Sequence, residues 1–222
     1  DLPVGDAKIR PDAESGYRAA QAATTEPVQE GCVGAGAGAT VGKVNGFGSG
    51  MKGCVGSASI ELPDGLIVAA LVVVNAEGDV VGPSGDVIAG VRTEDGQALA
   101  DARKLLRAGI AGVSWGRSGS QENTTLAVVA TNAPLTKSEA TVVAQMAHDG
   151  FARAIVPSHG PNDGDATFAL ATGALGRPVP ITIVGALAAE LCAEAIVRAV
   201  RSATGVPGFP SAHDLSSLAA AE

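Results

Sequence analysis

The stretch SASIELPDGLIVAALVVVN, from Ser57 to Asn75, predicts the centre of the fold. Its two strand-like segments are separated by Pro-Asp-Gly at residues 63–65, a combination typical of a tight turn between strands. We therefore expect two paired strands. The second strand is apolar throughout up to Val74, as is usual for a strand that is covered on both faces.

Helical and strand patterns surround this pair of strands. Strands are expected at 124–131 and 166–173, and helices at 11–24, 94–107, 136–155 and 183–203. The helix at 136–155 begins with a capping box, in which Thr136 is the cap and Glu139 follows three residues later. Strand pairs mixed with well-separated helices predict one layered α/β (or α+β) domain over residues 1–222, in which helices cover sheet.

The composition narrows the possible functions. Apolar residues make up 46% of the 222 residues but aromatic residues only 3%, so we expect a core packed from Ala, Val, Leu and Ile. The net charge of −8 comes without a basic stripe, which argues against a nucleic-acid partner because phosphate binding needs clustered cations. The longest apolar run, residues 66–74, is too short to span a bilayer, so we expect no membrane partner.

Cysteine usage and the start of the chain give two further expectations. Cys32, Cys54 and Cys192 are odd in number and lack a C-x-x-C spacing, which is unlike a zinc site or a disulfide framework. We therefore predict reduced thiols in a cytosolic protein. The chain opens without Met, on DLPVGDAKIRPDAESGYRAA, which resembles the middle of a domain and predicts that an upstream segment is absent.

The motif GAGAGA at residues 34–39 formally fits the dinucleotide fingerprint G-x-G-x-x-G/A. That fingerprint follows a strand and opens a helix, and here the next residues, TVGKVNGFGSG, are a poor helix. A small-residue strand or turn that allows close packing is therefore favoured over a dinucleotide-dependent enzyme.

Three interpretations apply to Asn123-Thr124-Thr125, which stand directly before a predicted buried strand. The motif fits a glycosylation acceptor, an ordinary turn, or a peptide bond that the protein cuts in itself. Reduced thiols and the strand immediately downstream argue against glycosylation. The three residues alone favour the turn.

A pair of carboxylates, Asp163 and Asp165, flanks Gly164 just before the last predicted strand. An Asx turn explains one of them, but two acids so close repel each other unless a cation or a donor lies near. A functional pair and a plain turn are equally supported, and no neighbouring ligand set completes a metal site. His148 lies on a predicted helix, and His159 is near enough to the acids to shape their loop.

Several stretches together resemble the L-aminopeptidase/D-esterase family of self-cleaving N-terminal-nucleophile hydrolases, which includes β-peptidyl aminopeptidases and nylon-oligomer hydrolases. They include GAGAGATVGK, MKGCVGSASIELPDGLIVAALVVVNAEGDVV, NTTLAVVATNAPLTKSEA and MAHDGFARAIVPSHGPNDGDATFALATG. These stretches follow the family order and cover most of the chain. The resemblance implies a four-layer αββα sandwich, with two central sheets flanked by helices.

The resemblance also implies that the bond between Asn123 and Thr124 is the self-cleavage site. An α part, residues 1–123, and a β part, residues 124–222, would stay associated after the cut. Thr124 would then carry both the attacking hydroxyl and a free amino group that acts as its base. The Gly/Ser-rich loop at 109–122 would supply the freedom that a strained precursor turn needs.

Supporting roles follow from the same resemblance. Lys43 matches the lysine that nylon-oligomer hydrolases place beside the nucleophile, and Asn75 matches an asparagine that donates to the oxyanion. Asp163 and Asp165 match the paired acids that orient the nucleophile or bind the free amino group of a substrate.

The function implied is hydrolysis of small peptides or amides through an acyl-enzyme on Thr124, without a metal or an organic cofactor, in a cytoplasmic homo-oligomer. Family members have a further N-terminal segment, with a residue that assists the oxyanion, and the resemblance predicts that this segment is absent from the sequence. Asn-Thr at the cleavage site resembles the nylon-oligomer branch, whereas aminopeptidases commonly have Gly-Ser. Two alternatives remain: a nylon-oligomer-type amide hydrolase, and an unprocessed, non-catalytic fragment or binding subunit.

Overall fold

A four-stranded sheet forms the centre of the computed structural model, which describes residues 1, 3–109 and 123–219. Its strand order is β3 (Cys54–Glu61), β4 (Ile67–Val74), β7 (Leu126–Thr131) and β9 (Ala166–Ala171). All neighbouring pairs are antiparallel except β7 and β9, which are parallel. The predicted strand pair and its Pro-Asp-Gly turn are confirmed, with Gly65 in the left-handed conformation at φ +83°.

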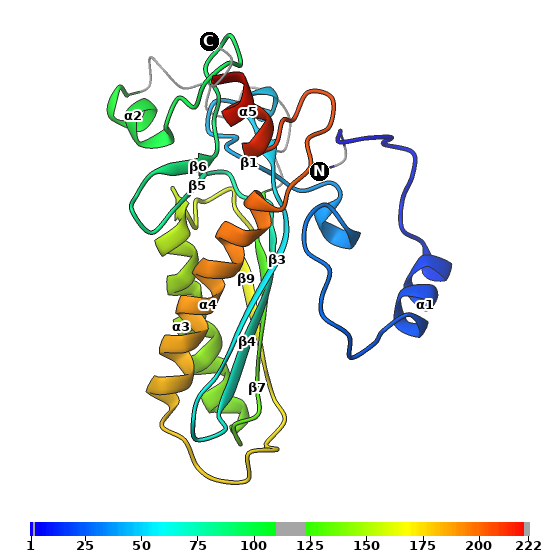
Figure 1. Cartoon of the computed structure of the whole chain (residues 1–222), viewed down its shortest axis with the longest axis vertical. Helices are drawn as coiled ribbons and strands as arrows, with labels where there is room; N and C mark the ends of the chain where they lie inside the picture. Colours follow the sequence, from blue (N-terminus) through cyan, green and yellow to red (C-terminus); the bar gives the residue numbers. More distant parts are fainter. Residues whose placement is uncertain (2, 110–122, 220–222) are drawn as a thin grey trace.

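Helices α3 (Lys137–Ala154) and α4 (Ile181–Arg201) lie side by side on one face of this sheet (Figure 1). The core between the two layers is aliphatic apart from one aromatic ring, as the composition predicts, and it includes Val68, Val72, Val129, Phe151 and Ile196. The capping box is confirmed, because the Thr136 hydroxyl accepts from the Glu139 amide and the Glu139 carboxylate accepts from the Thr136 amide. The α/β class with helices covering sheet is therefore confirmed.

The opposite face of the same sheet is apolar and open in the described residues. Residues of β4 alternate between buried and partly exposed, so this strand is covered on one face there and not on both as its sequence predicts. On β9, Phe168 and Leu170 are 59% and 58% exposed, and Leu126 on the neighbouring strand β7, opposite Ala166, is also exposed. A sheet that is apolar on both faces is the kind that packs between two layers.

Two smaller sheets lie at the end of the main sheet where β3 begins and β4 ends. One pairs β1 (Thr40–Val41) with β2 (Met51–Lys52), and the other has the order β6 (Val87–Ala89), β5 (Asp79–Val81), β8 (Ile155–Val156). Short helical segments complete the description: α1 (Ala13–Gln21), η1 (Gly34–Gly36), η2 (Phe47–Ser49), α2 (Ala102–Arg107) and α5 (Ala212–Ala219). Figure 1 shows α1 standing away from the other elements, and none of its residues is buried.

Two local predictions change in the structure. The GAGAGA motif forms the single 3-10 turn η1 and then enters β1, so the close-packed turn is confirmed and no helix of a dinucleotide fingerprint follows it. Helix α2 is shorter than predicted because residues 92–99 form a bridged turn with Gly96 at φ +72°. The Gly/Ser-rich loop predicted at 109–122 lies outside the described residues beyond Gly109.

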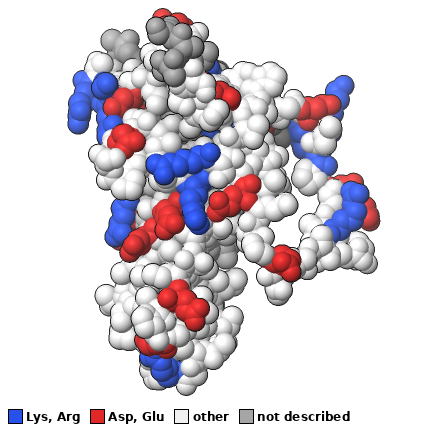
Figure 2. Space-filling model, viewed as in Figure 1, with Lys and Arg blue, Asp and Glu red and all other residues white. Residues whose placement is uncertain are grey.

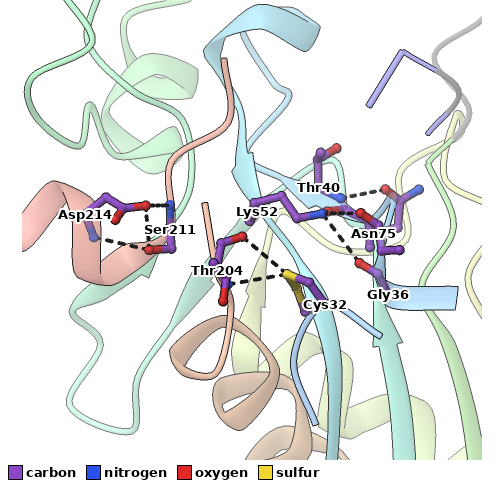
Figure 3. Close-up of a disulfide and its surroundings, with 11 residues drawn as sticks. Cys32, Gly36, Thr40, Lys52, Asn75, Thr204, Ser211 and Asp214 are labelled. Atoms are coloured by element: carbon purple, nitrogen blue, oxygen red, sulfur yellow. Dashed lines mark hydrogen bonds between the residues drawn. A yellow bond between two sulfur atoms is a disulfide. The ribbon is translucent and has the colours of Figure 1, made fainter. Parts of the chain in front are cut away.

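The prediction of reduced thiols is wrong for two of the three cysteines. Cys32 and Cys54 form a disulfide with a Cα–Cα distance of 4.8 Å (Figure 3). The bridge between Gly31 and Val55 brings the glycine-rich segment against the start of β3, a tertiary contact that cysteine spacing alone does not reveal. Cys192 remains a buried thiol, and burial raises its pKa to about 12.

Among the described residues, no helix is both long and apolar enough to cross a bilayer. On the face drawn in Figure 2, basic and acidic side chains are intermingled and do not separate into a single positive patch.

Candidate active site

Thr124 lies two residues before β7, which begins at Leu126 and not at Thr124 as the sequence predicts, and Asn123 and Thr124 are held from both sides. The Thr124 amide donates to the Asn75 carbonyl over 3.0 Å, and Asn123 forms a parallel bridge with Asp163. The Thr124 hydroxyl donates to the Asn123 carbonyl oxygen, with Oγ1 and O 2.5 Å apart. The hydroxyl therefore lies directly beside the peptide group that self-cleavage would break.

Gly164 lies against both the Asn123 carbonyl and the Thr124 hydroxyl. Its amide donates to the Asn123 carbonyl oxygen over 2.7 Å. A Cβ atom on Gly164 would lie 2.7 Å from Thr124 Oγ1, closer than such atoms approach in folded proteins. The glycine between the two acids is thus required for the approach of its loop to the hydroxyl, and it places an N–H donor on the carbonyl.

A buried lysine lies on the other side of Asn75. Lys43 is 1% exposed, and its Nζ donates to Asn75 Oδ1 over 3.0 Å. Because Asn75 Oδ1 also accepts from the Thr40 amide, the Nδ2 end is the donor end of this side chain, as an oxyanion role requires. Burial lowers the pKa of the Lys43 ammonium to about 7, although the charges of Asp163 and Glu77 oppose the shift.

The two aspartates lie beside each other, and Asp165 affects the ionisation of Asp163. Burial raises the pKa of Asp163 to about 7, and the charge and hydrogen bond of Asp165 add to this shift. Asp165 accepts from the Thr125 amide through Oδ1, with a distance of 2.9 Å. Asp163 accepts from the Glu77 amide through Oδ2. Acid–base groups work best when they titrate near the working pH, and both Asp163 and Lys43 titrate close to neutrality.

Sequence reasoning missed four polar residues around this cluster. Glu77 is 8% exposed, and burial raises the pKa of its carboxyl while Lys43 opposes that rise. Asp1 Oδ2 lies 3.1 Å from Lys43 Nζ and accepts from the Thr40 hydroxyl. The spacing of Glu77 two residues after Asn75 is a weak signal. Asp1 and Thr40 give no signal in the sequence, because Asp1 meets Lys43 and Thr40 meets Asn75 only in the fold.

Lys52 is the fourth residue, and it lies behind the glycine-rich segment (Figure 3). Its Nζ is fully buried and donates to the carbonyl oxygens of Gly36, Ala37 and Ala39 at 3.4, 2.9 and 2.7 Å. Burial, and then repulsion from Lys43, lower the pKa of Lys52 to about 8. Lys52 thereby fixes the backbone from which Thr40 donates to Asn75.

The described residues hold no group of three or more His, Cys, Asp or Glu side chains arranged to bind a metal ion. The arrangement is a half-buried hydroxyl, two carboxyls, a lysine of lowered pKa and an amide donor around one peptide bond. Such a set is suited to nucleophilic attack on a carbonyl with stabilisation of the resulting oxyanion.

Burial of this acid pair lowers the stability of the fold, and the effect is testable in a Thr124→Ala background, which would keep the chain intact if Thr124 is the self-cleaving residue. Because Asp163 keeps its proton to about pH 7 when folded but loses it near pH 4 when unfolded, stability falls as pH rises through this window. Asp163→Asn is therefore expected to raise the free energy of unfolding by about 1 kcal/mol at about pH 7.5 and by nothing at about pH 4.

Chemical denaturation at the two pH values measures this gain. Asp95→Asn is the matched control, since a hydrogen bond from Thr93 lowers the pKa of that exposed carboxyl and its loss should not stabilise the fold. A gain from Asp163→Asn of equal size at both pH values would contradict the assigned ionisation.

Solved structures with the same fold include two aminopeptidases. A Burkholderia sp. β-aminopeptidase superposes with a TM-score of 0.62 and 26% identity, over 94% of this chain and 57% of that one. An L-aminopeptidase D-Ala-esterase/amidase from Ochrobactrum anthropi, described as a variant of the Ntn hydrolase fold, superposes with a TM-score of 0.60 at 22% identity, over 93% of this chain and 56% of that one. The fold therefore agrees with the sandwich that the sequence predicts.

The model of peptidase family S58 matches residues 4–213, and the chain belongs to this family. Among curated relatives, an uncharacterized aminopeptidase of Mycobacterium tuberculosis is 38% identical over 97% of this chain, and one of Mycobacterium leprae is 41% identical over 95%. The chain spans 64% and 61% of the length of these two relatives. The predicted family resemblance is thus confirmed.

Proposed function

We propose that the protein is a self-cleaving N-terminal-nucleophile hydrolase that acts on amide bonds of small peptides or amides. The observation that carries the proposal is the position of the Thr124 hydroxyl, 2.5 Å from the Asn123 carbonyl oxygen, with the Gly164 amide donating to the same oxygen. Membership of peptidase family S58 supports the same chemistry.

Self-cleavage begins with attack of Thr124 Oγ1 on the Asn123 carbonyl carbon. Negative charge develops on the carbonyl oxygen, where the Gly164 amide already donates, and such donors lower the barrier by about 3 kcal/mol each. The C–N bond breaks, the nitrogen takes a proton, and an ester joins Asn123 to Thr124. Water then hydrolyses the ester to the Asn123 carboxylate and a free Thr124, dividing the chain into residues 1–123 and 124–222.

Substrate hydrolysis repeats this attack on a second carbonyl. The freed amine of Thr124 accepts the proton of its own hydroxyl, since an α-amino group ordinarily titrates at about 7.7–8.0. In its protonated form Lys43, which reaches the site through Asn75, disfavours a second positive charge on that amine, and Asn75 Nδ2 supplies an oxyanion donor. Asp163 and Asp165 orient the nucleophile through Thr125 and Gly164.

Aminopeptidase-type substrates are favoured by the relatives, whose printed names are aminopeptidases. An acidic pair beside the nucleophile also suits the free amino end of a small peptide or amide. A nylon-oligomer-type amide hydrolase differs from this proposal only in substrate. We further propose a homo-oligomer that needs no metal or organic cofactor and binds neither nucleic acid nor membrane.

The disulfide weakens the prediction of a cytosolic location. That prediction rests on reduced thiols, whereas Cys32 and Cys54 are bonded and disulfides persist in oxidising compartments.

Mass spectrometry of the purified wild-type chain tests the proposed function. Two fragments divided between Asn123 and Thr124 are expected, and they should co-elute in gel filtration because β7 lies between β4 and β9 in one sheet. A single intact mass after prolonged incubation, without hydrolysis of alanine p-nitroanilide, would favour the non-catalytic subunit instead.

A further inference from the structure

His159 lies outside the residues assigned above but contacts one of them directly. Its Nδ1 is 2.9 Å from Asp165 Oδ2, within ion-pair distance. The Asp165 side chain is only 3% exposed, whereas that of His159 is 36% exposed. The imidazole therefore covers the outer side of a buried carboxylate.

The other oxygen of Asp165 contacts the strand that carries the nucleophile. Asp165 Oδ1 accepts from the Thr125 amide over 2.9 Å, and the Ala166 amide donates back to the Thr125 carbonyl over 3.0 Å. Because Thr125 is fully buried and follows Thr124 directly, a displacement of Asp165 would change the position of the nucleophile.

Helix α3 holds the His159 ring in place. The rings of His159 and His148 are stacked, with centroids 4.7 Å apart and planes 9° apart, and the Phe151 centroid is 5.8 Å away. The backbone of His159 has φ +55°, a left-handed conformation that non-glycine residues adopt at a cost and that often marks functional sites. The imidazole is thus fixed from the ring face and from its own backbone.

We propose that His159 is a positioning residue for the hydrolytic reaction: it binds Asp165 and, through the Asp165–Thr125 contact, holds Thr124 in the attacking position. This inference rests on the proposed function, because it assigns a role within that same site. His159 connects α3 to the nucleophile through three consecutive contacts: its ring stack with His148, the 2.9 Å contact between Nδ1 and Asp165 Oδ2, and the hydrogen bond from the Thr125 amide to Asp165.

Several titratable groups face His159, and they determine how its loss would alter the pH profile. Helix α3 presents His148. Burial and the charge of His159 lower the pKa of His148, and the charges of Asp165 and Asp149 oppose this lowering. The loop before β9 presents Asp163 and Asp165, and Glu77 Oε2 lies against the neighbouring Gly160. The imidazole lies 2.9 Å from the carboxylate whose charge raises the pKa of Asp163, so its removal is expected to raise the pKa of Asp163 further.

Two substitutions of His159 separate the effect of its contact with Asp165 from the effect of its left-handed backbone. Glycine and asparagine both tolerate the left-handed conformation, so neither variant is strained at this position. His159→Gly removes the ring, whereas the Asn side chain in His159→Asn retains an N–H donor near the place of Nδ1. His213→Ala, which removes a histidine exposed on α5, is the matched control.

In the processed wild-type background, His159→Gly is expected to lower kcat on alanine p-nitroanilide about tenfold to a hundredfold with little change in KM. The acidic limb of its kcat/KM profile should move to higher pH. His159→Asn should recover most of kcat, free imidazole should partly restore His159→Gly, and His213→Ala should match wild type.

The outcomes distinguish this inference from the function on which it rests. An uncut and inactive wild-type chain overturns the proposed function and the inference together. A cut, active wild type with an equally active His159→Gly variant overturns the inference alone. A His159→Gly variant that loses activity in proportion to its thermal stability, with an unmoved pH profile and no rescue by imidazole, also overturns it.

Discussion

Replacement of Thr124 by alanine is expected to leave the chain uncut and to abolish amide hydrolysis. The variant lacks the oxygen that contacts the Asn123 carbonyl, so neither the ester nor the acyl-enzyme can form. We expect kcat to fall by roughly 10⁴-fold or more, because removal of a nucleophile leaves only the contribution of the oxyanion donors and of binding. Electrophoresis and the rate of p-nitroaniline release measure the two effects.

Thr124→Ser is the matched control for this prediction. It retains the hydroxyl and loses one methyl group, so self-cleavage and hydrolysis should both persist. The fold should be unaffected in either variant, because the Thr124 amide still donates to the Asn75 carbonyl. Hydrolysis by an uncut Thr124→Ala chain would show that another residue is the nucleophile.

Local patterns in the sequence were sufficient to predict the main elements. The Pro-Asp-Gly turn and the Thr136 capping box are formed by residues close together in the chain, and both occur as predicted. The helix predicted at 94–107 failed in its first half because Thr93, Asp95 and Gly96 close a turn by hydrogen bonds that compete with the helix.

The site was only partly predictable. Lys43, Asn75 and the residues at 123–124 and 163–165 were identified by a family pattern, and the fold gathers them around one peptide bond, although their catalytic roles stay proposals. The contacts of Asp1, Glu77 and Lys52 depend on where distant loops meet, which periodicity cannot give. The same reason explains the missed disulfide, since Cys32 and Cys54 are brought together by the backbone bridge between Gly31 and Val55.

The single-faced burial of the main sheet has a similar explanation. The sequence of β4 is apolar on both faces, and it predicts a layer on each. The described residues supply the helical layer, while the chain spans 57% of the Burkholderia structure that it matches. The sequence of a strand thus indicates how many of its faces are suited to burial, and the described residues cover only one of the two faces of β4.

Gly164→Ala is expected to block self-cleavage while leaving the fold intact. The added methyl group would lie 2.7 Å from Thr124 Oγ1, and the nearest atom in its way is the end of a side chain that can rotate about χ1. The hydroxyl would therefore turn away from the Asn123 carbonyl before any backbone moves. We expect the rate of processing to fall about a hundredfold, as is usual when a reacting group is displaced by about 1 Å.

Gly48→Ala is the matched control, because no atom lies within 4 Å of the position of its Cβ and its backbone is not left-handed. Both variants exchange one glycine for alanine, so they change the entropy of the unfolded chain alike, and their melting temperatures should be similar. Only Gly164→Ala should accumulate as the intact chain. If it were processed as fast as Gly48→Ala, the hydroxyl could attack from another rotamer, and the contact between Thr124 Oγ1 and the Asn123 carbonyl would not be the reactive one.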